Sequence, residues 1–132
     1  MTGLDTNILV RFVMADDAAQ AAGAKALFRS FSAQSPGFIS LVGLAEFVWV
    51  LRSTYRQPKS AIIQWIGQFL GAAELIFESQ AAVELALHDF SKGAADFADC
   101  LINRSGENAG CNETVTFDRN AARAAKMRLL PS

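Results

Sequence analysis

The sequence predicts an α/β/α sandwich with a central parallel sheet of about four to five strands. Three observations lead to this prediction. Short apolar segments alternate with longer segments of helical periodicity almost throughout the chain, which is the pattern of a parallel sheet covered by helices. The 132 residues fit one domain spanning 1–132, because a chain of this length buries about two-thirds of its unfolded surface. Neither an internal repeat nor a Pro/Gly-rich linker divides it.

The individual elements follow from local composition. The predicted strands are short and apolar: Gly3-Leu4, Phe38-Ile39, 74–77 and 114–117, with Leu129-Leu130 ending the sheet. The predicted helices carry apolar residues at helical spacing: 17–33, 41–54, 58–71, 80–91, 96–105 and 119–127. Pro36-Gly37 breaks the chain before the second strand, Ser40 is the expected N-cap of the next helix, and Pro58 lies at the start of another.

Composition excludes several kinds of chemistry. The only histidine, His88, rules out two-histidine nuclease mechanisms and histidine-rich zinc sites. Cys100 and Cys111 lack the spacing of a zinc knuckle or redox pair, and we expect free thiols. A net charge of -1 argues against coating nucleic acid by bulk electrostatics. Any metal site must therefore use oxygen ligands.

The start of the chain and its hydropathy indicate a cytoplasmic protein. Residues 1–5 do not resemble a signal peptide. No apolar run approaches the roughly 20 residues that a membrane span requires, and Glu46 interrupts the most apolar one. We therefore expect no membrane partner.

Glu46 is the acid whose surroundings are least suited to a charge. Its helical neighbours three and four positions away are Val42, Gly43, Trp49 and Val50, none of which is a charge partner. Burying an unpaired carboxylate costs several kcal/mol. Glu46 is therefore either on an exposed helix edge or a functional acid held at the edge of the core.

Four further acids lie where strands end or helices begin. Asp5 follows the first strand, Asp118 follows the fourth, and Asp96 and Asp99 share a helix face. Each of Asp5, Asp96 and Asp118 is also a suitable helix cap, and the helix dipole suffices to explain Asp99. The carboxyl ends of parallel strands form the ligand-binding edge of such sheets. If these acids and Glu46 converge there, a hard cation such as Mg²⁺ or Mn²⁺ relieves their repulsion.

Four short segments, in order, resemble the acidic motifs of the PIN-domain nucleases, and specifically the VapC-type ribonuclease toxins. The segments are Leu4-Asp5-Thr6-Asn7-Ile8-Leu9-Val10-Arg11, Ser40-Leu41-Val42-Gly43-Leu44-Ala45-Glu46, Ala95-Asp96-Phe97-Ala98-Asp99-Cys100-Leu101-Ile102 and Thr114-Val115-Thr116-Phe117-Asp118-Arg119. Each alone is weakly specific, but the ordered set spans nearly the whole chain.

The resemblance implies a Mg²⁺- or Mn²⁺-dependent endoribonuclease with a PIN-like fold. Its catalytic acids would be Asp5, Glu46, Asp99 and Asp118, with Asp96 as a secondary metal ligand or a cap. Asn7 and Thr116 would be polar supports. The expected partners are RNA, a VapB-type antitoxin that reaches into the acidic cleft, and a second copy of the chain in a homodimer.

Other side chains have a functional and a structural interpretation. Arg11, Arg104 and Arg119 lie near the acidic motifs and are either phosphate ligands or solvated charges. Most aromatic residues recur at core spacing: Phe28, Phe31, Phe47, Trp49, Trp65, Phe69 and Phe77. Some apolar surface of residues 41–70 is a candidate dimer face or antitoxin groove. His88 is expected to be structural or exposed.

Two other functions compete with the nuclease. A PIN-like module that binds RNA or protein without hydrolysis would keep the same acids. A phosphotransfer domain with an aspartyl phosphate also places acids at strand ends. Thr6-Asn7 rather than a second aspartate follows Asp5, however, and the only late lysine, Lys126, falls in a predicted helix.

Overall fold

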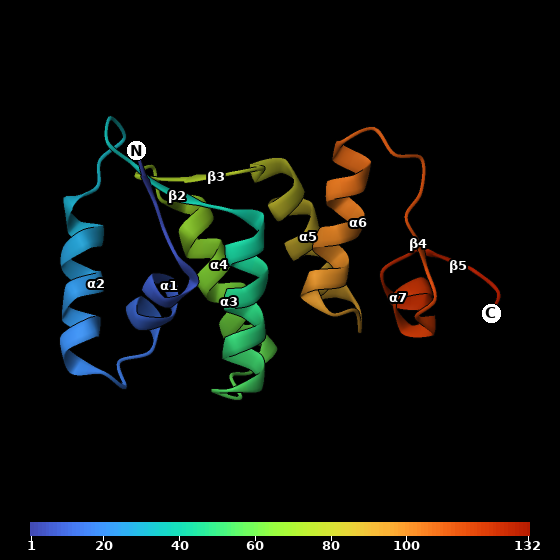
Figure 1. Cartoon of the computed structure of the whole chain (residues 1–132), viewed down its shortest axis with the longest axis horizontal. Coiled ribbons are helices and arrows are strands. Elements are labelled where there is room, and N and C mark those ends of the chain that lie inside the picture. The colour runs from blue at the N-terminus through green and yellow to red at the C-terminus, as the bar shows by residue number, and fades with distance from the viewer. The chain divides into compact units, whose positions relative to one another are not determined.

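The structure, a computed structural model, describes residues 1–132 and contains seven helices and five strands (Figure 1). The chain divides into two compact units, Met1–Glu78 and Ser79–Ser132. Each unit has its own parallel sheet. The predicted α/β class with parallel strands is confirmed.

The first unit combines a three-stranded sheet with four helices. Its elements are β1 (Thr2–Gly3), α1 (Thr6–Val13), α2 (Ala18–Ser30), β2 (Gly37–Ile39), α3 (Leu41–Ser53), α4 (Lys59–Gly71) and β3 (Leu75–Phe77). The strand order is β1-β2-β3, and all pairs are parallel. Gly37 lies opposite Thr2 on one side and Leu75 on the other. The middle strand therefore sets the register of the sheet.

The second unit is mainly helical. Its elements are α5 (Gln80–Lys92), α6 (Phe97–Asn108), β4 (Val115–Thr116), α7 (Arg119–Ala124) and β5 (Arg128–Leu129). Strands β4 and β5 pair only with each other, through Arg128 N–H to Thr114 O and Leu130 N–H to Thr116 O, both at 2.8 Å. The prediction of one sheet of four to five strands is thus corrected: the five strands form sheets of three and two. Strands of two residues form very few hydrogen bonds with a neighbour, so their partners cannot be predicted from the sequence.

Aromatic rings fill the interior of the first unit. The Phe12 and Phe28 rings stack with centroids 4.1 Å apart, and Phe69 contacts both as well as Phe47 and Trp65. Such contacts add about 0.5–1.5 kcal/mol per pair beyond the burial of area. The predicted core positions of Phe47, Phe69 and Phe77 are confirmed, since all three are buried; Phe28, Phe31 and Trp65 are half-buried.

Trp49 is the exception among the predicted core aromatics. Its side chain is 65% exposed, and that of Val42 on the same helix is 80% exposed. Helix α3 is apolar around much of its circumference, and only the stripe with Gly43, Leu44, Phe47, Val48 and Leu51 is buried. The prediction for Trp49 is therefore wrong, because apolar character alone does not identify the packed face of such a helix.

Helix α1 is absent from the sequence prediction. The run Ile8-Leu9-Val10 contains β-branched residues and follows a strand directly, so its composition does not favour a helix. Leu9 and Val10 are nevertheless buried, and the Asp5 side chain accepts a hydrogen bond from Thr6 N–H at 2.9 Å. Capping and tertiary packing thus outweigh the local propensity.

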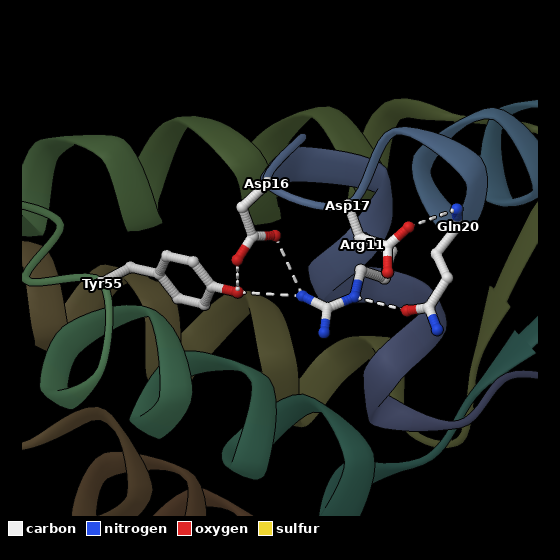
Figure 2. A network of polar contacts seen from close by, with 5 residues as sticks. All are labelled: Arg11, Asp16, Asp17, Gln20 and Tyr55. Carbon is white, nitrogen blue, oxygen red and sulfur yellow. Dashed lines mark hydrogen bonds and ion pairs between the residues drawn. The ribbon is translucent and has the colours of Figure 1, made fainter.

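A polar network ties the end of α1 to α2 and to the segment after α3 (Figure 2). The Arg11 guanidinium donates to Gln20 Oε1 at 2.7 Å, Asp16 Oδ1 at 3.0 Å and the Tyr55 hydroxyl at 2.9 Å. The Tyr55 hydroxyl in turn donates to Asp16 Oδ2 at 2.7 Å. These contacts raise the pKa of Arg11, chiefly through the Tyr55 hydrogen bond. Arg11 is therefore engaged within its own unit.

In the second unit, α5 and α6 pack together. The Phe90 and Phe97 rings meet edge to face with centroids 5.6 Å apart. Arg104 on α6 donates two hydrogen bonds, of 2.6 and 3.0 Å, to the carboxylate of Asp89 on α5. Cys100 is buried and Cys111 is exposed, and no disulfide joins them. None of the helices has the length and apolar character needed to cross a membrane.

Candidate functional site

Asp5 lies between β1 and α1 and caps the helix. Its backbone is extended, and its Oδ1 accepts from Thr6 N–H. The preceding Leu4 is buried while Asp5 itself is exposed. A buried residue on either side fixes the backbone here, so the carboxylate is presented to solvent from a well-anchored junction.

Thr6 links this junction to Glu46 on α3. Thr6 is the one buried polar residue of the chain, at 5% exposure, and its hydroxyl donates to Glu46 Oε1. The sequence does not reveal this link, since nothing in the spacing connects residues 40 positions apart. The hydroxyl positions Glu46 relative to Asp5.

Gly43 allows α3 to approach this junction closely. A Cβ at position 43 would lie 3.0 Å from Ser40 Oγ, 3.8 Å from Leu4 O and 4.0 Å from Thr6 Oγ1. Ser40 Oγ also accepts from Gly43 N–H at 3.0 Å, so it is the N-cap that the sequence predicts. The start of α3 is therefore packed against residues 4–6.

Glu46 is exposed, so its carboxylate is not buried in the core. Its partner is a neutral hydroxyl, and no cation is paired with it. Its apolar neighbours Val42 and Trp49 are exposed with it, whereas its hydrogen-bond partner Thr6 is buried. Its candidate role now depends on its link to Asp5 through Thr6.

Three acids of the second unit lie near enough for their charges to interact. Asp96 is the N-cap of α6, Asp99 lies in the first turn of that helix, and Asp118 is the N-cap of α7. Asp99 is half-buried. Burial raises its pKa, and the charges of Asp96 and Asp118 raise it further. Both effects oppose the helix dipole, which by itself would lower the pKa of an acid in the first turn.

The capping contacts use one oxygen of each aspartate. Asp5 Oδ1 accepts from Thr6, Asp96 Oδ1 accepts from Ala98 N–H at 3.1 Å, and Asp118 Oδ1 accepts from Asn120 and Ala121 N–H at 2.8 and 3.1 Å. Each Oδ2 is left without a hydrogen bond to the protein. A carboxylate has about four lone-pair sites, so capping and metal binding are compatible at these positions.

The two predicted supporting residues have different surroundings. Thr116 Oγ1 accepts from Asp118 N–H at 2.9 Å, so Thr116 fixes the backbone of that acid. Asn7 is exposed and lines a cavity of about 350 Å³ with Ile8, Arg11 and Gln20. It makes no hydrogen bond to Asp5 or Glu46.

The donor set suits a hard divalent cation, since all candidate ligands are carboxylate oxygens. Within neither unit do three or more acidic, histidine or cysteine side chains gather as a metal-holding group. The raised pKa of Asp99 shows that its surroundings disfavour added negative charge. A cation near Asp99 would stabilise its ionised carboxylate.

Two of the three arginines near the acidic motifs have partners within the protein. Arg11 belongs to the network of Figure 2. Arg104 binds Asp89 and Glu107. Arg119 is exposed, without an ion pair. Of the three, only Arg119 is thus available as a phosphate ligand.

Asp99→Asn is expected to stabilise the protein at neutral pH. Because the folded-state pKa of Asp99 is raised, the folded chain binds a proton more tightly than the unfolded chain, and ionised Asp99 destabilises the fold above that pKa. Below the ordinary aspartate pKa both states are protonated and the penalty disappears. Thermal unfolding should show a higher Tm for the variant at pH 7, with a gain that shrinks as pH falls. The exposed Glu84→Gln serves as a control and should move Tm little at either pH. A lower Tm for Asp99→Asn at pH 7 contradicts the assignment.

Comparison with known proteins identifies the family. A match to the PIN domain extends over residues 4–127, and it includes all five candidate acids. A search of curated proteins found no match. Because the family match covers well over half of the sequence, the chain belongs to the PIN domain family, whose members are generally nucleases.

Proposed function

We propose that the protein is a Mg²⁺- or Mn²⁺-dependent endoribonuclease of the VapC toxin type. The observation that carries the proposal is the half-buried Asp99, whose pKa is raised by burial and by Asp96 and Asp118. A partly buried carboxylate with a raised pKa and acidic neighbours is typical of catalytic and metal-binding sites. Membership of a family of nucleases supports the hydrolytic assignment.

The metal-holding residues in this proposal are Asp5, Glu46, Asp96, Asp99 and Asp118. Such an ion, when bound, stabilises negative charge on a phosphodiester and acidifies a water molecule. The caps on Asp5, Asp96 and Asp118 hold each carboxylate by Oδ1 and leave Oδ2 for a ligand. Thr6 orients Glu46, and Thr116 orients Asp118. Asp99 holds a proton more readily than an ordinary aspartate, and a bound cation would favour its ionised form.

Cleavage of RNA tests the catalytic roles. Purified protein should cut a mixed-sequence RNA with Mg²⁺ or Mn²⁺, and EDTA should abolish the cutting. Asp5→Asn, Glu46→Gln and Asp99→Asn should each lower the rate at least about a hundredfold, since charge stabilisation by a metal is worth several kcal/mol. Glu84→Gln removes one exposed carboxylate of the second unit and should cut at the wild-type rate.

The three variants replace carboxylates with amides that preserve shape and, at position 5, the ability to cap. Wild-type thermal unfolding curves would confirm that Asp5→Asn and Glu46→Gln fold normally. Unchanged cleavage in all three variants would refute the nuclease site. RNA that is bound but not cut with any divalent ion would instead identify a non-catalytic binding module.

A paramagnetic ion tests whether the acids of both units serve one site. Mn²⁺ titrated into ¹⁵N-labelled protein should broaden the amide signals around Asp5 and Glu46 at the same concentrations as those around Asp99 and Asp118. In Asp99→Asn the broadening around Asp5 should weaken as well. Broadening confined to residues of one unit would show that the acids do not share an ion.

We also propose a VapB-type antitoxin and a homodimer as partners. Both follow from the resemblance to VapC-type toxins, and the exposed Val42 and Trp49 of α3 supply apolar surface for a second copy. Light scattering after gel filtration should give twice the 14.2 kDa of one chain, and Trp49→Ser should shift it toward the monomer. The product of a short gene adjacent to this one, when added, should inhibit RNA cleavage. A monomeric wild type would remove the homodimer from the proposal.

A further inference from the structure

A small cavity in the second unit lies apart from the acids described above. It has a volume of about 200 Å³ and opens between the end of α5 and the residues that follow α7. The residues that line it include His88, Asp89, Lys92, Ala125 and Lys126. Its volume is below the range of about 300–1,000 Å³ typical of sites for drug-sized ligands. It therefore suits a compact group.

The charged side chains around the cavity leave an excess of positive charge. Asp89 is its only carboxylate, and Arg104 holds that carboxylate with hydrogen bonds of 2.6 and 3.0 Å. This pairing lowers the pKa of Asp89, with smaller contributions from Lys126 and His88. Neither Lys92 nor Lys126 forms an ion pair. The negative charge is thus balanced by Arg104, and both ammonium groups remain available.

The backbone of Lys126 gives an independent indication of function. Its φ of 61° lies in the left-handed region, which favours glycine or asparagine and is uncommon for other residues. A lysine is found at this position instead, and its side chain lines both this cavity and a neighbouring one of about 250 Å³ beside Arg104. Unfavourable backbone conformations of this kind concentrate at binding and catalytic sites.

We propose that Lys92, Lys126 and His88 form a binding site for a phosphate group. Lysine is a compact point charge that binds phosphate well, and the ring N–H of His88 adds a donor from the same face of α5, four residues before Lys92. The phosphate belongs either to the backbone of an RNA strand or to a free phosphate ion. The RNA source rests on the proposed ribonuclease function.

RNA binding without cleavage tests the first source. Fluorescence anisotropy with a labelled single-stranded RNA in EDTA should show that Lys92→Gln/Lys126→Gln binds about fourfold more weakly near 0.15 M salt. The slope of log K against log salt should fall by about 0.7, which corresponds to one phosphate no longer neutralised. Lys25→Gln removes one positive charge from an exposed position on α2 and should leave both quantities unchanged.

Inorganic phosphate tests the second source. Titrated into the ¹⁵N-labelled wild-type protein, it should shift the amide signals of residues 88–92 and 124–126, and the double glutamine variant should lose these shifts. Lys92→Arg/Lys126→Arg keeps both charges and should restore binding, which separates a charge effect from a folding defect.

The outcomes distinguish the sources and the two proposals. Weaker RNA binding in the double variant assigns the site to the RNA backbone, whereas loss of phosphate shifts with unchanged RNA affinity assigns it to free phosphate. If neither changes, or if Lys25→Gln weakens RNA binding equally, the inference is overturned. Because binding is measured in EDTA, failure here leaves the cleavage results intact, and absence of cleavage leaves the phosphate titration intact.

Discussion

At each junction from a strand to a helix in this protein, a side chain accepts a hydrogen bond from a backbone amide in the first turn of the helix. Asp5, Ser40, Ser79 and Asp118 follow β1, β2, β3 and β4, and each accepts from a backbone amide of the helix that it opens. Strands of two or three residues form too few ladder bonds to direct the chain by themselves. Caps contribute about 1 kcal/mol each, and here they also orient the side chains on which the proposed chemistry depends.

Among the acids of the second unit, Asp99 lowers stability where the capping residues raise it. Asp99 gains no capping contact, and both burial and its two acidic neighbours work against its ionised form. A carboxylate that costs stability in this way is typical of sites where function requires a local conflict of charge. Asp96 and Asp118, by contrast, stabilise helix ends while contributing to that conflict. Within the second unit, the acids that stabilise helix ends are thus the same acids that raise the pKa of Asp99.

The sequence was sufficient for features with local causes. Ser40 and Asp96 are caps as expected, and the strand around Phe38-Ile39 and the helices after Pro58 and before Gly93 lie close to their predicted positions. Features that depend on residues far apart in the chain could not be predicted from the sequence. The Thr6–Glu46 bond joins residues 40 positions apart, and Arg11 meets Tyr55 across 44. The exposure of Trp49 and the division of the strands into two sheets likewise follow from packing rather than from local pattern.

The shared use of a carboxylate for capping and for a ligand has an evolutionary consequence. Selection for folding alone would keep a capping residue at Asp5, Asp96 and Asp118 even in a lineage that had abandoned hydrolysis, because asparagine and aspartate cap almost equally well. Asp99 has no such second reason to persist. A descendant that has given up its chemistry can therefore accept many residue types at position 99, whereas the three capping positions stay restricted to residues that cap a helix.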